Sequence, residues 1–397
     1  MAQAAFSGML GDMKNEENNT KKWGGDPSRF INKISVEEDC LDLPYTQAIL
    51  SRANGLPVEV IPSRSYPLFT SPYPESLQDG KRHLLLARNL GRFFKPCPAT
   101  REYRCCDYQV LNIGMNCPMD CVYCILQAYL NNPHLSFFVN IDQMFDEINA
   151  AFAAEPDRFW RIGTGEFTDS MAIDRLTGLS PLLVKFMAKQ KKAVLELKTK
   201  SAAIGHLAEL DHQGRTIVAW SLNSPTVMAR EELRTATLAE RLAAAAQCAE
   251  WGYKLAFHFD PIIYHPDWQQ GYSETIRQLY EAVPKEAIVW ISMGALRFLP
   301  NLKKIAVKRF PNSRFFHEEF VIGLDNKSRY FRQLRVDLYR HLYDELQKRK
   351  ADHTAVYCCM ESDEIWQDVF GYKPEDKGGL AAILDRAATY DYSPIKK

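Results

Sequence analysis

The chain has 397 residues, of which 46% are hydrophobic and 12% aromatic, which is enough to bury one large core with smaller appendages. Lys plus Arg and Asp plus Glu each number 49, so the formal net charge is zero; this excludes a globally basic nucleic-acid coat and leaves only local polyanion contacts. The composition excludes a disordered chain, and no apolar run approaches the roughly 18 residues of a membrane helix. We therefore expect a cytoplasmic protein that makes no membrane contact.

Region 1–106 is predicted to be the least regular part of the chain. Its first 23 residues are polar, mix acids with bases and carry no apolar signal core, so we expect a loose tail. The remainder is rich in proline and arginine, with one short helix predicted near Pro44–Asn54. We expect an N-terminal tail followed by an irregular basic region.

Region 107–310 alternates apolar, strand-like runs with amphipathic helical patterns. Strands are predicted at Tyr108–Ile113, Phe159–Gly163, Ala193–Lys198, Thr216–Leu222, Tyr253–Phe259 and Ala287–Ser292. Helices are predicted at Ile141–Phe152, Pro181–Gln190, Ala202–Leu210, Leu238–Trp251 and Ser273–Ala282. This alternation implies a parallel sheet with right-handed crossovers. The predicted fold class is α/β, a partial TIM barrel of (β/α)6 type whose chemistry lies at the C-terminal ends of the strands.

Two local patterns sharpen these boundaries. Thr237 is followed three residues later by Glu240, a capping box that starts a helix, and Gly252 is a stop signal at its end.

Region 311–397 is predicted to be an α/β extension with a charged segment, a long helix at Arg332–Lys350 and a final strand and helix. The long helix carries an apolar stripe of Leu334, Leu338, Leu342 and Leu346.

The cysteines carry the strongest chemical signal. Six of the ten fall between Cys97 and Cys124, and such bunching in a chain expected in a reducing compartment favours metal ligation over disulfides. Cys117, Cys121 and Cys124 form a C-x3-C-x2-C motif directly after the first predicted strand. A four-iron cluster takes four ligands, so three cysteines leave one iron open. A zinc knuckle, which prefers four ligands in two pairs, is the alternative.

This motif, with an aromatic residue before its last cysteine, resembles the radical S-adenosylmethionine superfamily. The resemblance implies a [4Fe–4S] cluster on Cys117, Cys121 and Cys124, with S-adenosylmethionine on the open iron. One-electron cleavage would release a 5′-deoxyadenosyl radical, chemistry that belongs to the cofactor. The resemblance also implies a catalytic role for Tyr123 and a flavodoxin- or ferredoxin-type electron donor.

Further segments are similar to the spore photoproduct lyase family. They include Tyr123–Gln127, Phe138–Asn140, Arg161–Ser170, Lys198–Lys200, Trp220–Ser224, Gly252–Leu255 and Asp260–Ile262. By this resemblance, the S-adenosylmethionine site would be lined by Glu166, Thr168, Lys200, Ser221 and Asn223. All five fall at the C-terminal ends of predicted strands, on one rim of the barrel, and they supply polar partners for a zwitterion. Ordinary strand-end turn residues are the alternative for Lys200 and Ser221, and a buried carboxylate or N-cap for Glu166.

The chain departs from that family at two places. The lyase returns a hydrogen atom from a cysteine on the loop after the second strand, but no cysteine lies between Cys124 and Cys248, and the matching position falls at or near Glu166. The family's second tyrosine is replaced by Ile125. The hydrogen would have to return from 5′-deoxyadenosine or from another residue, or the substrate differs.

Two basic segments suggest a nucleic-acid face. Lys81–Arg104 holds seven bases against one acid, and Lys303–Lys350 holds thirteen bases against six acids, which suits a phosphate backbone. Lys327, Arg329 and Tyr330 fall where the family places a DNA-contacting hairpin, and they are predicted to bind the substrate by wedging or stacking. A solvated helix and turn face is the alternative.

The remaining chemistry-bearing residues have plain interpretations. Cys97, Cys105, Cys106, Cys358 and Cys359 are expected to be buried thiols, although a second metal centre is conceivable. His258 is expected to be a satisfied core histidine. The predicted function is reductive cleavage of S-adenosylmethionine with hydrogen abstraction from damaged DNA of the thymine-dimer type. The rivals are the same chemistry on a non-DNA substrate, and a non-enzymatic iron–sulfur or zinc protein.

Overall fold

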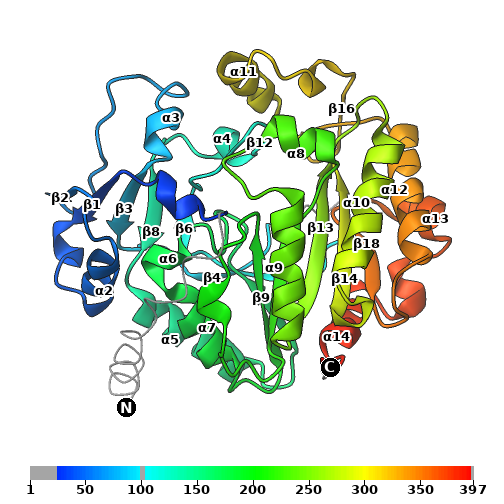
Figure 1. Cartoon of the computed structure of the whole chain (residues 1–397), viewed down its shortest axis with the longest axis horizontal. Coiled ribbons are helices and arrows are strands. Elements are labelled where there is room, and N and C mark those ends of the chain that lie inside the picture. The colour runs from blue at the N-terminus through cyan, green and yellow to red at the C-terminus, as the bar shows by residue number, and fades with distance from the viewer. Residues whose placement is uncertain (1–24, 99–102, 395–397) are drawn as a thin grey trace.

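A computed structural model describes residues 25–98 and 103–394. The tail predicted for the first 23 residues lies outside this range. The main element is an eight-stranded, curled and open α/β sheet (Figure 1). Its strands are β4 (Phe94–Pro96), β5 (Gln109–Leu111), β9 (Trp160–Gly163), β10 (Ala193–Thr199), β11 (Thr216–Ser221), β13 (Lys254–Ile262), β14 (Ile288–Ala295) and β18 (Ala355–Cys358).

The strand order is β18-β14-β13-β11-β10-β9-β5-β4. Every pair from β5 to β18 is parallel, and only β4, next to β5, is antiparallel. All six predicted barrel strands are therefore confirmed in order. The sheet is larger than expected, because the late strand β18 joins it as a seventh parallel strand and β4 adds an edge.

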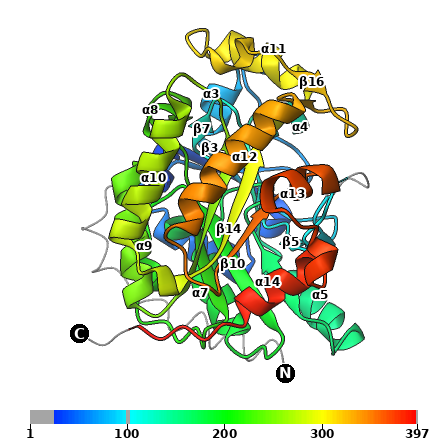
Figure 2. The ribbon, with the colours of Figure 1, turned by 90° about the vertical axis from the view of Figure 1, so that its right-hand side faces the viewer.

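Helices cover the outer face of this sheet (Figures 1 and 2). They are α5 (Ile141–Ala154), α7 (Leu179–Met187), α9 (Leu238–Glu250), α10 (Trp268–Ala282), α12 (Arg332–Gln347), α13 (Asp363–Phe370) and α14 (Leu380–Ala388). The capping box is confirmed, since Thr237 and Glu240 each accept from the other's backbone N–H, at 3.2 and 2.8 Å. Gly252 then adopts the left-handed φ of 88° that ends α9.

One predicted helix is wrong. Residues 202–210 form only a short 3-10 turn, Gly205–Leu207. The amide of Ala202 donates to the Gly25 carbonyl at 3.2 Å, and that of Ala203 donates to Ser201 Oγ at 3.0 Å. Apolar spacing alone did not reveal that this segment forms a short turn in place of a helix.

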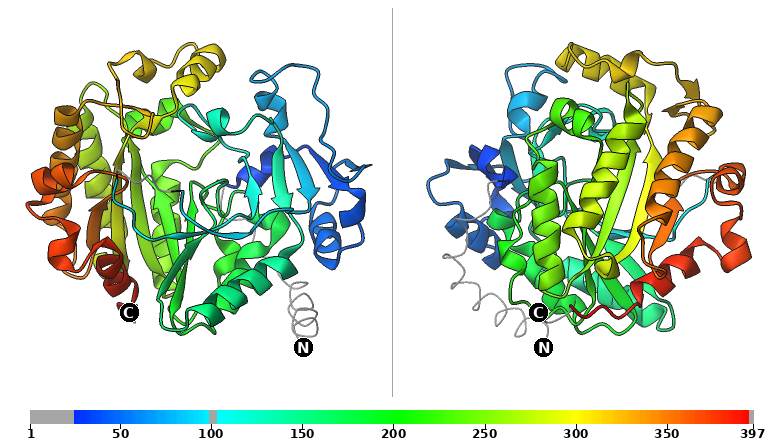
Figure 3. Two further views of the ribbon diagram at one scale, coloured as in Figure 1. Left: turned by 180° about the vertical axis from the view of Figure 1, so that it is seen from behind. Right: turned by 45° about the vertical axis from the view of Figure 1, so that its right-hand side comes forward.

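The N-terminal region is not irregular as expected. It supplies β1, β2 and β3 to a second sheet with the order β2-β1-β3-β8-β6, visible beside the main sheet in Figure 3. Its strands are β1 (Lys33–Glu37), β2 (Val58–Ile61), β3 (His83–Ala87), β6 (Gly114–Met115) and β8 (Leu135–Phe138), with α2 (Pro44–Arg52) and α3 (Leu77–Gly80) between them. The first four sheet neighbours are parallel, and β6 is antiparallel to β8. Such short apolar runs with distant partners carry little periodic signal.

Several small elements surround the mouth of the main sheet. A three-stranded antiparallel sheet joins β15 (Arg297–Phe298), β17 (Ser328–Arg329) and β16 (Val321–Ile322). A two-stranded pair joins β7 (Asp120–Cys121) to β12 (Glu232–Leu233). The helices α4 (Leu126–Tyr129), α8 (Pro225–Glu231) and α11 (Pro300–Arg309) complete this end of the molecule.

Candidate metal centre

The three-cysteine loop lies where the two sheets meet. The chain leaves the main sheet at β5, enters the smaller sheet as β6, and then forms the loop. Asn116 marks the turn with a left-handed φ of 67°. Its Nδ2 donates to the carbonyls of His134 at 2.9 Å and Asn132 at 3.2 Å. A side chain that satisfies two buried carbonyls explains why asparagine is favoured at this positive φ.

The loop backbone is held by a short strand pair and one buried amide. Strand β7 pairs with β12, so that Cys121 lies opposite Glu232. The fully buried Gln127 donates from Nε2 to the carbonyls of Cys121 and Val122, both at 3.1 Å. These bonds fix the backbone between the second and third cysteines before any metal binds.

The arrangement of the thiols suits a cluster better than a single ion. Cys121 is buried, and Cys117 and Cys124 are partly exposed. Within the described residues, only Glu37, Asp39 and Cys40 place three candidate ligand atoms within 4.8 Å of one another. The loop thiols are therefore spaced more widely than one ion requires, whereas each thiolate of a cubane binds a different iron. The three sulfur donors fit a multi-iron cluster.

Buried cations surround the loop. The ammonium of Lys81, 1% exposed, donates to the Met119 carbonyl at 2.8 Å and lies 3.3 Å from Asp120. Arg309 contacts the same carboxylate at 2.9 Å. Burial raises the pKa of the Cys121 thiol to about 12, and the nearby Lys200 opposes that rise. Positive charge near a thiol favours the thiolate, which is the form that binds metal.

Tyr123 is fixed beneath the loop. Its buried hydroxyl donates to Glu232 Oε1, and Glu232 in turn pairs with Arg241 at 2.6 Å. The Lys200 ammonium lies 5.8 Å from the centre of the Tyr123 ring. Burial raises the pKa of Glu232, but Arg241 and Lys200 outweigh this and hold it below its ordinary value. The structure thus places Tyr123 and Lys200 together beside the cysteines.

The other residues predicted to bind the cofactor differ in burial and in hydrogen bonding. Asn223 is 1% exposed and already bonded, donating to the Pro261 carbonyl at 2.8 Å and accepting from the Tyr272 hydroxyl at 2.5 Å. Ser221 is buried at the end of β11, and Thr168 is partly exposed. Glu166 is exposed and lies within electrostatic range of Cys97, Lys198 and Cys359.

Sequence reasoning missed Asp169, which joins two strand ends beside the cysteines. Its carboxylate accepts from the amides of Met171 and Ala172 and from the Thr199 hydroxyl, at 2.6 to 3.0 Å. Its second oxygen accepts from the Lys200 amide at 2.8 Å, and it lies close enough to raise the pKa of Cys117. The Asp-Ser pair soon after a strand was the available signal.

One buried polar atom at this edge has no partner. Thr164 follows β9 directly, is 1% exposed, and its hydroxyl has no hydrogen-bond acceptor or donor within the described part of the chain. Buried hydroxyls are normally satisfied. An open hydrogen-bonding atom at the C-terminal end of β9 fits a polar ligand such as S-adenosylmethionine at this rim.

The residues predicted to wedge into DNA are buried. Lys327, Arg329 and Tyr330 are 8%, 1% and 0% exposed. Arg329 pairs with Asp325 at 2.6 Å and its guanidinium lies 4.2 Å from the Tyr103 ring centre. The Tyr264 amide donates to the Tyr330 hydroxyl oxygen at 3.1 Å. The hairpin instead exposes three apolar side chains, Val321 at 47%, Ile322 at 61% and Leu324 at 71%.

Many cations of the two basic segments have internal partners. Arg104 binds Asp363 and Glu375, and Arg309 binds Asp120. The exposed lysines of α11, Lys303 and Lys304, carry no ion pair among the described residues. Figure 2 shows α11 and β16 at the same end of the molecule. Two exposed lysines of the second basic segment therefore lie on α11, at the same end of the molecule as the apolar hairpin.

His258 is a satisfied core histidine, as expected. Its ring nitrogens lie 2.7 Å from Ser292 Oγ and 2.8 Å from Glu196 Oε1. Tyr108 and Trp290 donate to the same carboxylate at 2.7 and 2.9 Å. Burial raises the pKa of Glu196, but these partners and His258 above all hold it at about 2. The carboxylate is ionised, and the hydrogen bonds of Glu196 and His258 are satisfied by other side chains without a ligand.

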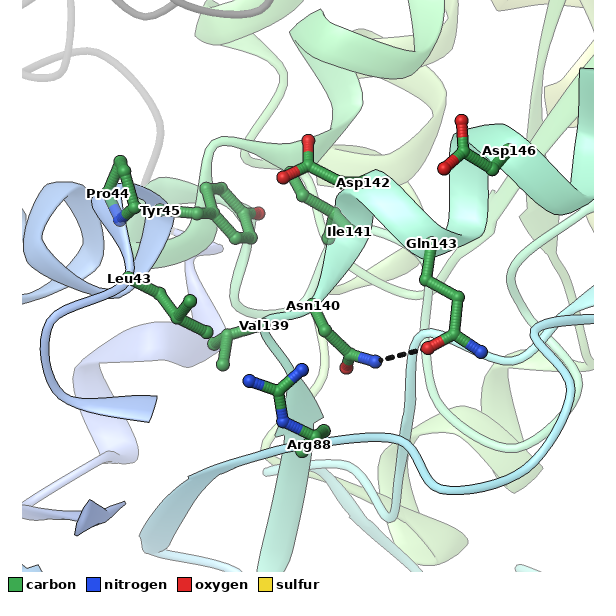
Figure 4. A pocket seen from close by; sticks show the side chains of 10 residues that line it. All are labelled: Leu43, Pro44, Tyr45, Arg88, Val139, Asn140, Ile141, Asp142, Gln143 and Asp146. Atoms are coloured by element: carbon green, nitrogen blue, oxygen red, sulfur yellow. Dashed lines mark hydrogen bonds between the residues drawn. The ribbon is translucent and has the colours of Figure 1, made fainter. Parts of the chain in front are cut away.

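A separate hollow of about 280 Å³ lies between α2 and α5 (Figure 4). Arg88, Asp142 and Asp146 line it, and Asn140 donates to Gln143 at 2.9 Å across its floor. None of the three loop cysteines lines it.

In the described parts of the chain, no helix is both long and apolar enough to cross a bilayer.

Comparisons with known proteins agree with this architecture. Spore photoproduct lyase of Bacillus subtilis (strain 168) is 23% identical over 319 residues, covering 79% of this chain and 90% of that protein. The same enzyme of Geobacillus sp. (strain Y412MC61) is 26% identical over 333 residues, covering 82% and 94%.

Solved structures show the same fold. A mutant spore photoproduct lyase with dinucleoside spore photoproduct superposes with a TM-score of 0.75 at 21% identity, covering 83% of this chain and 99% of that one. A second mutant, with AdoMet and the same dinucleoside bound, gives 0.74. The family model described as spore photoproduct lyase matches residues 99–361, which include the cysteine loop and every strand of the main sheet except β4. The chain therefore belongs to the spore photoproduct lyase family.

Proposed function

We propose that this chain is a radical S-adenosylmethionine enzyme that repairs a DNA photolesion of the thymine-dimer type. The observation that carries the proposal is the three-thiol loop at the C-terminal edge of a parallel, curled sheet. That edge is where barrels of this kind perform chemistry. The relatives named above are spore photoproduct lyases, which points to the same reaction class.

The residues that would hold the cofactors follow from the site. Cys117, Cys121 and Cys124 would bind a [4Fe–4S] cluster and leave one iron for S-adenosylmethionine. When bound, this pair supplies a one-electron cleavage that yields a 5′-deoxyadenosyl radical. S-adenosylmethionine would lie along the rim marked by Glu166, Thr168, Lys200, Ser221 and Asn223, with Thr164 Oγ1 as a further contact.

The side chains around the loop have three tasks. Lys81 and Arg309 neutralise Asp120 and keep the cluster environment positive. Tyr123 is buried and is held beside the cysteines by its hydrogen bond to Glu232. Asp169 ties the end of β9 to the end of β10, so that contacts from both strands keep a fixed geometry.

DNA would contact the end of the molecule that carries α11 and the hairpin. The exposed Val321, Ile322 and Leu324 present an apolar edge, and Lys303 and Lys304 present charge beside it. Apolar wedges flanked by cations can unstack and extrude a damaged base pair. We place the substrate contact on these exposed residues, while Lys327, Arg329 and Tyr330 stiffen the hairpin from within.

The test is an anaerobic incubation with dithionite, S-adenosylmethionine and UV-damaged DNA. Release of repaired thymine together with 5′-deoxyadenosine supports the proposal, and a Cys117→Ala, Cys121→Ala, Cys124→Ala variant is the control without a cluster. Formation of 5′-deoxyadenosine without repair would remove the lesion assignment alone. A colourless protein that forms neither product would favour the zinc alternative.

Two features of the sequence favour a different substrate as a second candidate. The loop after β9 carries Glu166 and no cysteine, and Ile125 follows the last cluster cysteine. DNA binding measured across salt separates the two, since phosphate contacts give an affinity that falls steeply with salt. We also propose a flavodoxin- or ferredoxin-type electron donor and a cytoplasmic location.

A further inference from the structure

The inner face of the main sheet carries two layers of polar side chains. Side chains two residues apart on a strand point to the same face. Glu196 lies in the lower layer, bonded to His258 and to Tyr108. Two residues further along each strand, Lys198 on β10 and Asp260 on β13 form the layer above, nearer the mouth.

Cys359 belongs to this upper layer. It follows β18, two residues after the inward Tyr357, and its amide donates to the Met293 carbonyl at 2.8 Å. The guanidinium of Arg297 lies 3.7 Å from its sulfur and 3.1 Å from Asp260. Gly294 makes room for this pair, since a Cβ there would lie 2.6 Å from the Asp260 carboxylate.

The open side of the curled sheet is closed beside this thiol. Arg104, which precedes β5, lies at the opposite edge of the sheet, where its amide donates to the Glu361 carbonyl at 3.0 Å. Cys97, which directly follows β4, lies within electrostatic range of Cys359, Glu166 and Lys198. Residues from both edges of the sheet therefore surround one partly exposed thiol at the mouth.

We propose that the Cys359 thiol donates the hydrogen atom that ends the radical reaction. This inference rests on the proposed function. The S–H bond of Cys359 breaks homolytically, a C–H bond forms at the substrate carbon radical, and a thiyl radical remains on sulfur. One electron from a low-potential reductant of the class that reduces the cluster, with one proton from solvent, restores the thiol.

The protonation state of Cys359 suits this role, and the other cysteines are less suitable. Burial raises the pKa of its thiol to about 11, even though Arg297 opposes that rise, so the hydrogen stays on sulfur at neutral pH. Cys105 is different, because the hydrogen bond with Cys106 lowers its pKa to about 6, and a thiolate has no hydrogen to give. Cys358 is fully buried and Cys248 lies on α9, away from the mouth.

The decisive variant is Cys359→Ser, assayed anaerobically in D₂O with UV-damaged DNA. Serine keeps a polar group beside Arg297, but its O–H bond is too strong to donate hydrogen to carbon. We expect wild type to release thymine carrying solvent deuterium. Cys359→Ser should still form 5′-deoxyadenosine and should lose both the deuterium label and most of the repaired thymine. Cys248→Ser is the matched control and should behave as wild type.

Each other outcome overturns the inference. If Cys359→Ser repairs DNA with the wild-type deuterium content, the thiol has only a structural role. If Cys97→Ser causes the loss and Cys359→Ser does not, the donor is Cys97. If wild type forms 5′-deoxyadenosine but no thymine, the proposed function fails and this inference falls with it, whereas repair without deuterium means that the hydrogen returns from 5′-deoxyadenosine.

Discussion

Replacing Arg241 with methionine should destabilise the protein strongly, and the substitution leaves every predicted ligand residue itself unchanged. Arg241 is 0% exposed. Its guanidinium donates to the carbonyls of Ala236 and Ser221, to Thr235 Oγ1 and to Glu232 Oε2, at 2.6 to 3.0 Å. Methionine fills similar space and leaves the Glu232 carboxylate buried without its main counter-charge.

The magnitude follows from the geometry. Removing one partner of a buried ion pair costs about 3–5 kcal/mol. Tyr123 still donates to Glu232 and Lys200 is nearby, so we expect about 3 kcal/mol, near the lower end of that range. The double variant Arg241→Met, Glu232→Gln removes both charges and should cost only about 1–2 kcal/mol, because no unpaired charge remains.

Urea unfolding of the apo protein under reducing conditions measures both changes. A loss of 3 kcal/mol should lower the midpoint by about 1 M if the slope is about 3 kcal/mol/M. In wild type the pKa of Glu232 is depressed, so its stabilisation is present at neutral pH and is lost as pH falls. In Arg241→Met the unpaired carboxyl's pKa should rise, so the variant's deficit should shrink as pH falls toward the ordinary glutamate value of about 4.3.

Two results would refute this reasoning. A single variant that loses less than about 1 kcal/mol would mean that the pair behaves as an exposed one. A double variant that loses as much as the single would mean that the hydrogen bonds to the carbonyls, and not the unpaired carboxylate, carry the cost.

Three further predictions can be tested separately. Lys81→Met should lower the iron bound per chain after anaerobic reconstitution, because Asp120 loses a buried cation beside the thiols; Lys33→Met, at an exposed pair with Glu59, is the control. Ile322→Asp with Leu324→Asp should weaken DNA binding and leave 5′-deoxyadenosine formation in the absence of DNA unchanged, whereas Val58→Asp, at an exposed position on the small sheet, should change neither. Burial lowers the pKa of Lys254 to about 8. Because the folded state loses this proton at a lower pH than the unfolded chain, stability should rise as pH increases from about 8 toward the free lysine value of about 10.4. Lys254→Met should flatten that rise, as measured by urea unfolding.

The barrel strands and the cysteine loop could be predicted because their signals are local. Apolar runs such as Thr216–Ser221 are buried on both faces and sit between helical patterns. The capping box at Thr237 is complete within four residues. The cysteine motif spans only eight residues, so it can be recognised without knowledge of distant contacts.

The rest depends on partners far apart in the chain. Arg329 reads as an exposed cation among aromatics, yet Asp325 and the distant Glu361 draw it into the interior. Lys81 belongs to a segment that reads as basic surface, but Met119 and Asp120 bury it. No local pattern predicts the burial of these cations, because each is paired with a carboxylate or carbonyl that only the folded structure brings close.

The contact between Lys81 and the cysteine loop has a consequence for how the molecule can be divided. The strand pattern alone suggests that residues 107–310 are self-sufficient, with the preceding sheet as an accessory. A fragment beginning at Asp107 would lack Lys81 and would leave the carbonyl of Met119 without its donor. Iron binding should therefore require the segment that carries Lys81 in the same polypeptide as the cysteine loop.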